Sequence, residues 1–284
     1  MGFAARLGTA LDQLRPQLPE HVAFAAWDLR EREPVLLDAE RPLQPASTIK
    51  TLIMVAALRR VRDGALTLDH PVDLPAHRVG GSGVLREIPS ASRLALGDLI
   101  NLMIVVSDNA ATNAVLDTLG FDAVAACARE LGAESTRVER HLMDHSATGT
   151  NTTTALDQAR VLDALATGFA LPEALSRRAL NTLARQQVRD RVPAALGRGA
   201  DVWNKTGELH GLRHDTALVG RGEPEAVLAV LVDGLTDERS TSDYRGGPGA
   251  DAITTLARAV WDALEGDEPL TDPPAASGRT RPPH

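Results

Sequence analysis

The chain has 284 residues, of which 43% are hydrophobic, so it can bury a large core as one domain or as two closely packed lobes. A formal net charge of −8, with no basic run interleaved with aromatics, argues against nucleic acid or anionic membrane as a principal partner. The lone cysteine, Cys127, rules out an internal disulfide. No stretch reaches the roughly 18 apolar residues of a membrane span, and no export signal is visible, so we expect a cytoplasmic protein.

Hydrophobic periodicity predicts the elements in chain order. A helix over residues 3–18 leads into two short strands, HVAFAAWDLR and PVLLDAE. From residue 47 to about 195 the apolar residues recur at spacings of three and four, which indicates helices. Three strand-like runs follow, DVWNKTG, RHDTALVG and EAVLAVLVDG, and then a closing helix, GADAITTLARAVWDALEG. We expect the late strands to complete the sheet that the early strands begin.

The first chemical motif is Ser47-Thr48-Ile49-Lys50, at the start of an apolar helix. Side chains three residues apart lie on one helix face, so Lys50 can reach Ser47. A serine hydroxyl needs a neighbouring base to become a nucleophile, and a lysine among apolar neighbours can lose its proton and act as that base. The alternative is that Ser47 is an N-cap and Lys50 a solvated residue of the first turn.

Lysine usage favours the chemical interpretation. Lys50 and Lys205 are the only two lysines, and every other strong base is arginine. A bias towards arginine would explain the general loss of lysine but would not select these two positions. Chemistry would select them, because arginine cannot be deprotonated in a protein.

Two further motifs follow along the chain. Ser107, Asp108 and Asn109 come after an apolar run, where by themselves they are good N-cap residues. Lys205-Thr206-Gly207 places a lysine on a strand before a glycine that lets backbone approach a ligand; its alternative is a strand end with a solvated lysine. The order S-x-x-K, S-D-N, K-T-G is the motif set of class A β-lactamases and penicillin-binding proteins.

The sequence therefore resembles the penicillin-recognising serine hydrolases, specifically the class A β-lactamase-like branch, from about residue 20 to 265. Sixty residues separate the two motif serines, GGSGVLREI begins at Gly80, Asn113 ends an S-D-N-x-A-x-N run, and NTTT begins at Asn151. The resemblance implies an antiparallel sheet flanked by the N- and C-terminal helices, with an inserted all-helical lobe and a cleft between them. We assign 1–40 and 196–266 to the α/β lobe, 41–195 to the helical lobe and 267–284 to a disordered tail.

The resemblance also implies catalytic roles. Ser47 is the acylated nucleophile, Lys50 its base, and Ser107 the hydroxyl that relays a proton to the leaving nitrogen or oxygen. The backbone N–H groups of Ser47 and Glu208 form the oxyanion hole. Glu208 is an unusual neighbour for an anion site: an inward side chain opposes a carboxylate substrate, whereas an outward rotamer leaves it unaffected.

Substrate-binding roles follow in the same way. Asn109 holds the substrate amide, and Lys205 and Thr206, followed by Gly207, anchor a substrate carboxylate. Arg213 is a second cation for that carboxylate. We expect a small-molecule substrate, no cofactor and no metal.

One departure from the family concerns deacylation. Class A β-lactamases carry a glutamate two residues after an arginine, and here Arg140-His141-Leu142 places leucine there. Asp144 and His145 are candidate substitutes for that base. A metal site at His141 and His145 is disfavoured, because a third ligand and the glutamate of H-E-x-x-H are missing.

The predicted function is a serine hydrolase that acts through an acyl-enzyme on an amide, ester or β-lactam carbonyl. It should be weak on β-lactams, because the base that activates the deacylating water contributes about 10²–10⁴-fold. The alternatives are a penicillin-binding peptidase or transpeptidase, a β-lactam sensor that acylates once, and an interaction role unconnected to the cleft. The oligomeric state stays open.

Overall fold

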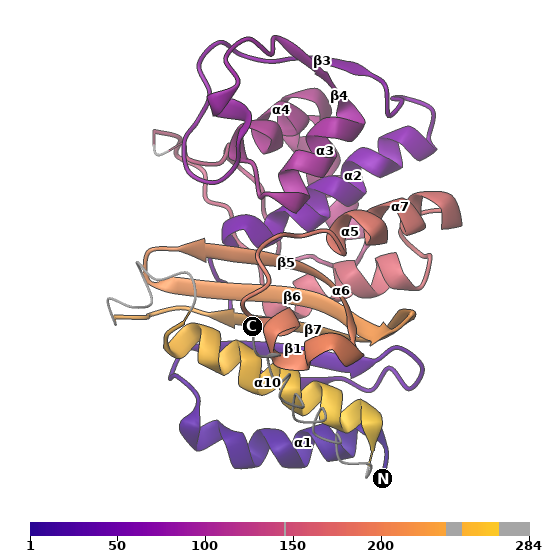
Figure 1. The fold of residues 1–284 in the computed structure, drawn as a ribbon, viewed down its shortest axis with the longest axis vertical. Helices are drawn as coiled ribbons and strands as arrows, with labels where there is room; N and C mark the ends of the chain where they lie inside the picture. The colour runs from indigo at the N-terminus through magenta and orange to yellow at the C-terminus, as the bar shows by residue number, and fades with distance from the viewer. Residues whose placement is uncertain (145, 237–245, 267–284) are drawn as a thin grey trace, which may run out of the picture.

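The computed structural model describes residues 1–144, 146–236 and 246–266. Its centre is a five-stranded antiparallel sheet in the order β2-β1-β7-β6-β5 (Figure 1). The first and last parts of the chain meet in this sheet, where Phe24 pairs with Val230. The strands are β1 (Val22–Asp28), β2 (Val35–Leu37), β5 (Asp201–Leu209), β6 (Leu212–Arg221) and β7 (Glu223–Val232).

Both faces of the sheet are covered, which explains why β1 and β7 are apolar over most of their length. Helices α1 (Phe3–Leu14) and α10 (Pro248–Glu265) lie against one face (Figure 1). Phe24 of β1 packs in their core, whereas Ala25 and Trp27 belong to the core on the other face. A strand buried on both sides shows no alternation of polar and apolar residues.

Helix α6 (Ala155–Ala166) packs on the second face, and the remaining helices of the inserted part lie beyond it. They are α2 (Lys50–Arg62), α3 (Leu96–Val105), α4 (Asn109–Leu119), α5 (Phe121–Glu130) and α7 (Glu173–Leu183). Helix α2 is the central one, because ten of its 13 residues are buried. The predicted fold class, an antiparallel sheet flanked by terminal helices with an inserted helical part, is confirmed.

Local details differ from the prediction. The region expected to be all helical contains a two-stranded sheet of β3 (Pro71–Asp73) and β4 (Arg93–Ala95), whose three-residue strands are too short to show periodicity. The first helix ends at Leu14 instead of residue 18, and a 3₁₀ turn, Arg15–Gln17, follows it; Pro16 in this turn has no N–H to continue the α-helix.

The lobe limits stay a prediction. Helix α8 (Val192–Leu196) crosses the proposed boundary between residues 195 and 196, and it packs with α10. The tail 267–284, predicted to be disordered, lies outside the described residues. Within the described ranges, no helix combines the length and apolarity needed to cross a membrane.

Candidate active site

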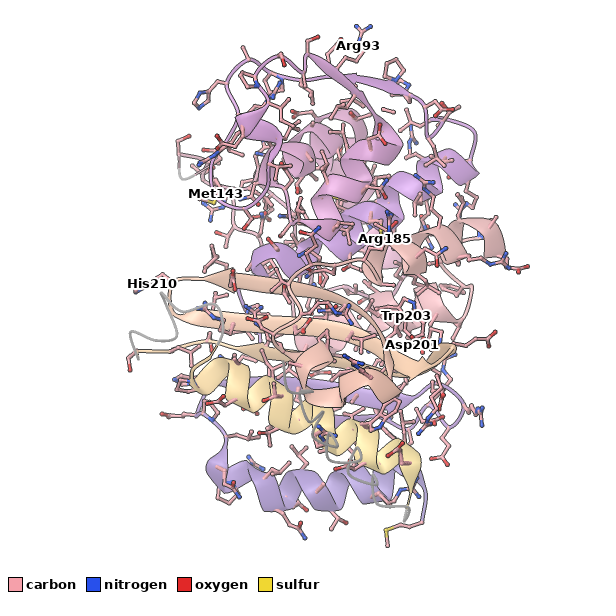
Figure 2. The ribbon with its side chains drawn as sticks, in the orientation of Figure 1. Arg93, Met143, Arg185, Asp201, Trp203 and His210 are labelled. Carbon is pink, nitrogen blue, oxygen red and sulfur yellow. The ribbon has the colours of Figure 1, made fainter. Side chains whose placement is uncertain are left out.

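A cavity of about 460 Å³ brings together residues from all three motifs' neighbourhoods. It is lined by Ser47, Asn109, Leu142, Glu208 and Arg213, among others. Met143 and His210 also line it, and Figure 2 shows both on the same side of the molecule, one on the helical part and one at the end of β5.

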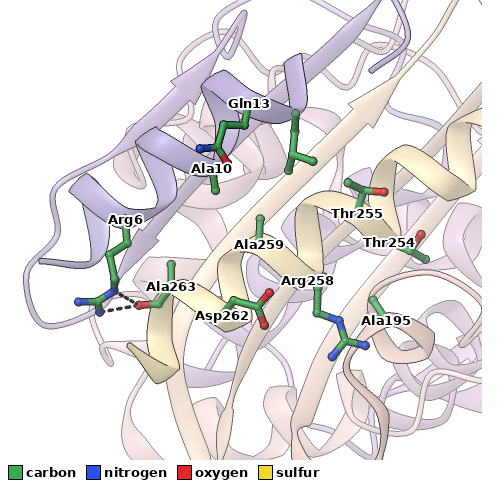
Figure 3. A pocket seen from close by; sticks show the side chains of 11 residues that line it. Arg6, Ala10, Gln13, Ala195, Thr254, Thr255, Arg258, Ala259, Asp262 and Ala263 are labelled. Atoms are coloured by element: carbon green, nitrogen blue, oxygen red, sulfur yellow. Dashed lines mark hydrogen bonds between the residues drawn. The ribbon is translucent and has the colours of Figure 1, made fainter. Parts of the chain in front are cut away.

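A second cavity, of about 610 Å³, lies between α1 and α10, on the other side of the sheet (Figure 3). Its polar lining includes Arg6, Gln13, Arg258 and Asp262, and Arg6 donates two hydrogen bonds to the Ala263 carbonyl at 2.6 and 2.9 Å. It contains none of the residues that the sequence singled out. The predicted chemistry therefore belongs to the cavity that Ser47 lines.

Ser47 lies in a 3₁₀ turn, Ala46–Ile49, immediately before α2. It caps neither this turn nor α2, whose N-cap residue is Ile49, so the N-cap alternative is wrong. The residue before it, Ala46, has a φ of 47°, a backbone conformation that costs energy outside glycine. Among the described residues none hydrogen-bonds to the Ser47 hydroxyl, which leaves it open to the cavity.

Lys50 is fully buried behind Ser47, which contradicts the alternative of a solvated lysine. Its Nζ donates to the Ser107 carbonyl at 2.7 Å, to Ser107 Oγ at 3.1 Å and to Asn109 Oδ1 at 2.8 Å. Burial lowers the pKa of the Lys50 ammonium well below its usual value, and the nearby charge of Lys205 lowers it further. The lowered pKa favours the neutral amine, which is the form that can accept a proton.

Ser107 connects the two lysines of the chain. Its Oγ also accepts a hydrogen bond from Lys205 Nζ at 3.1 Å. Lys205 is fully buried, and burial is the main cause that lowers its pKa to about 7. Ser107 has a φ of 55°, so its backbone is held in a conformation that few serines adopt. The result is a hydrogen-bonded row, Lys50–Ser107–Lys205, beneath the cavity.

Asp108 holds the loop after Gly80 against α4. Its side chain caps the first turn of α4, so the N-cap interpretation is correct for this one residue of the motif. The same carboxylate accepts hydrogen bonds from the Val84 and Leu85 amides, each at 2.7 Å. Gly83 permits this contact, because a Cβ there would lie 2.3 Å from Asp108 Cγ and its φ is 113°.

A close contact with the Ser47 turn explains why the third motif ends in a glycine, Gly207. A Cβ at this position would lie 3.0 Å from the Pro45 carbonyl oxygen and 3.1 Å from the Ser47 amide nitrogen. The glycine therefore lets β5 lie directly against the turn that carries Ser47. Thr206 is buried, and its Oγ1 accepts a hydrogen bond from Gln186 Nε2 at 2.8 Å.

The Glu208 side chain is ion-paired with Arg191, a residue that sequence reasoning missed. Arg191 is fully buried, and its Nη1 also donates to the His214 carbonyl at 2.9 Å. No motif or spacing marks Arg191 in the sequence. Arg213, predicted as a carboxylate anchor, lines the cavity and donates to the Leu212 carbonyl at 3.2 Å.

The loop that carries Leu142 is fastened at two points. The Asn113 side chain accepts a hydrogen bond from the Leu142 amide at 2.8 Å and donates one to its carbonyl at 3.1 Å. Asn151 accepts from the Glu139 and Arg140 amides at 2.9 and 3.2 Å, and so closes the loop on itself. Leu142 is thus held at the wall of the cavity.

The structure does not bring the predicted substitute base Asp144 to the cavity. Its Oδ1 accepts hydrogen bonds from Ser146 Oγ at 2.6 Å and the Ser146 amide at 2.9 Å, and these lower the pKa of the exposed carboxyl. His145 lies outside the described residues. His141 does line the cavity, with Nε2 2.7 Å from Asp117 Oδ1. In the described part of the chain, no three side chains of His, Cys, Asp or Glu gather as metal ligands.

Comparison with known proteins agrees with this geometry. Residues 6–264 match the sequence profile described as the beta-lactamase enzyme family. A structure of PBP-A, solved for a leucine-to-glutamate variant as its acyl-enzyme complex with penicillin G, is 27% identical; the match covers 92% of this chain and 97% of that chain, with a TM-score of 0.81. A beta-lactamase from Sphaerobacter thermophilus DSM 20745 is 28% identical, over 94% of this chain and 98% of that one, with a TM-score of 0.79. The beta-lactamase regulatory protein BlaB of Streptomyces cacaoi is 26% identical over 293 residues, which cover 85% of this chain and 92% of that protein.

Proposed function

We propose, from the premise that this chain belongs to the beta-lactamase enzyme family, that it is a serine hydrolase which forms an acyl-enzyme on Ser47. The observation that carries the proposal is the buried row of Lys50, Ser107 and Lys205, with Ser107 Oγ 3.1 Å from the Nζ atom of each lysine. Two buried amines with lowered pKa values are a poor arrangement for stability alone and a useful one for proton transfer.

Acylation uses Lys50, Ser107 and Lys205, which already lie together, and Ser47, which precedes Lys50 by three residues. The neutral Lys50 amine takes the Ser47 proton as Oγ attacks the substrate carbonyl, and the Ser47–acyl bond forms. Lys50 then donates to Ser107 Oγ, which passes its own proton to the leaving nitrogen or oxygen as the scissile bond breaks. Lys205 on the other side of Ser107 keeps this hydroxyl in place.

The developing oxyanion is stabilised by the backbone amides of Ser47 and Glu208. The close approach of β5 to the Ser47 turn, which Gly207 permits, supports this pair of donors. Donors fixed before the reaction are worth about 10²–10³-fold in rate for each group. Asn109, Thr206 and Arg213 orient the substrate around the carbonyl.

Deacylation is the step in which this chain differs from a β-lactamase. Leu142 offers neither a lone pair nor a hydrogen bond to position a water, and Asn113 holds its backbone at the cavity wall. A bulky penicilloyl ester should therefore persist. Small esters and peptide-like amides leave the acyl carbon open to bulk water and should turn over better.

A second candidate function is a β-lactam sensor that acylates once and stays acylated. Leu142 favours it, and so does the similarity to the regulatory protein BlaB. A penicillin-binding peptidase or transpeptidase would pass the acyl group to water or to an amine from the same intermediate. These functions share the Ser47 ester and differ in its lifetime.

The test is intact mass followed over time after addition of a penicillin, a cephalosporin or a chromogenic ester, with Ser47→Ala as control. A penicillin adds its full mass, because ring opening releases no fragment. A hydrolase continues beyond one equivalent of product from the ester, whereas a sensor stops after one. The absence of any adduct or burst with all three compounds would contradict the proposed function.

A further inference from the structure

Glu208 lies where a substrate carboxylate is expected to bind. Side chains two residues apart on a strand project from the same face, so Glu208 shares its face of β5 with Thr206. Arg213 is directly opposite Glu208 on β6. The predicted anchors for a substrate carboxylate, Thr206 and Arg213, therefore both lie next to a carboxylate of the chain itself.

Arg191 holds the Glu208 side chain in this position through an ion pair. Its guanidinium is fully buried and forms the ion pair with Glu208, whose side chain is 20% exposed and lines the cavity. Burial is the main cause that lowers the pKa of Lys205 and raises the pKa of Asp215. The positive charge of Arg191 also affects the pKa of both groups, so Arg191 lies close to the region where a substrate carboxylate is expected to bind. A substrate carboxylate would have to displace Glu208 from Arg191 or lie beside it.

We propose that Glu208 is a specificity-determining residue which selects substrates whose leaving group carries no carboxylate. The substrate class is then an ester, thioester or amide with a neutral or cationic leaving group, held along the end of β5. The reason is that two carboxylates placed side by side repel each other strongly, and the guanidinium of Arg191 is already ion-paired with Glu208. This inference rests on the proposed acyl transfer through Ser47.

The test compares two thioesters of benzoylglycine that differ in one group. One has mercaptoacetate as leaving group and the other mercaptoacetamide, and a disulfide dye measures the released thiol. The quantity of interest is the ratio of kcat/KM for the carboxylate probe to that for the carboxamide probe. A change in the oxyanion hole alters kcat/KM for both probes by the same factor, so it cancels in this ratio.

The wild-type protein should favour the carboxamide probe by about tenfold or more. Glu208→Gln keeps a hydrogen-bond acceptor for Arg191 but removes the negative charge, and it should raise the ratio by about the same factor. Glu208→Ala is the second variant if the first does not fold. Glu173→Gln removes a glutamate from another arginine pair, with Arg177 on α7 far from the cavity, and should keep the wild-type ratio.

Each outcome is decisive. A wild-type preference for the carboxylate probe, or a ratio unchanged in Glu208→Gln, would overturn the inference and leave the proposed function standing, because the carboxamide probe still reports acylation. An equal rise in Glu173→Gln would assign the effect to net charge and not to Glu208. Thiol release that survives in Ser47→Ala would instead overturn the proposed function.

Discussion

Lys50→Arg separates a proton-transfer role from a purely electrostatic one. Lys50 Nζ is fully buried with three acceptors within 3.1 Å, so arginine would keep a positive charge at the same place. Arginine cannot lose its proton in a protein and therefore cannot accept the Ser47 proton. Loss of general-base catalysis is worth about 10²–10⁴-fold in the acylation rate, which corresponds to about 3–5 kcal/mol.

The assay is the single-turnover rate of acylation with the chromogenic ester, for wild type, Lys50→Arg and Lys50→Ala. Both variants should lose at least about 10²-fold, and a rise in pH should not restore the arginine variant. Thermal unfolding of each protein controls for the strain of placing a guanidinium in a packed site, which costs about 1–3 kcal/mol. The reasoning is refuted if Lys50→Arg keeps more than about a tenth of the wild-type rate, a loss under about 1.4 kcal/mol.

Three more outcomes are expected. Ser47→Ala should abolish every covalent adduct without unfolding the protein, because Ser47 caps no helix; an unchanged adduct by intact mass would end the mechanism. Leu142→Glu should shorten the lifetime of the penicillin adduct. Met143→Glu should not, because Met143 lies in the same cavity wall but lacks the contacts to Asn113. Equal adduct lifetimes in the wild type and both variants would show that the loop cannot aim a base at the acyl carbon. Lys205 keeps its proton to near its usual pKa of 10.5 when unfolded and loses it near 7 when folded, so the unfolded state binds more protons above pH 7. Between about pH 8 and 10, the free energy of unfolding of the wild-type protein should therefore rise with pH by about 1.4 kcal/mol per unit more than that of Lys205→Met. Urea denaturation at several pH values measures both proteins, and the same pH dependence in both would contradict this.

Much of the site is visible in the sequence because it is encoded in short windows. Ser47 and Lys50, or Lys205 and Gly207, are separated by fewer than four residues, so helix or strand geometry relates them without knowledge of the fold. The scarcity of lysine is a property of composition alone, and it marks both amines. The apolar runs of β1, β7 and α2 likewise predict buried elements, because an element that is covered on all sides is apolar at most of its positions.

Contacts between distant parts of the chain were decided only by the tertiary structure. Ser107 Oγ meets Lys50 and Lys205 across 57 and 98 residues of chain, and Glu208 meets Arg191 across 17. Such contacts depend on how packed elements orient individual rotamers, which no local pattern records. The same reason explains Asp144: its position after Leu142 makes it a candidate base, but its own loop binds the carboxylate through Ser146 and keeps it out of the cavity.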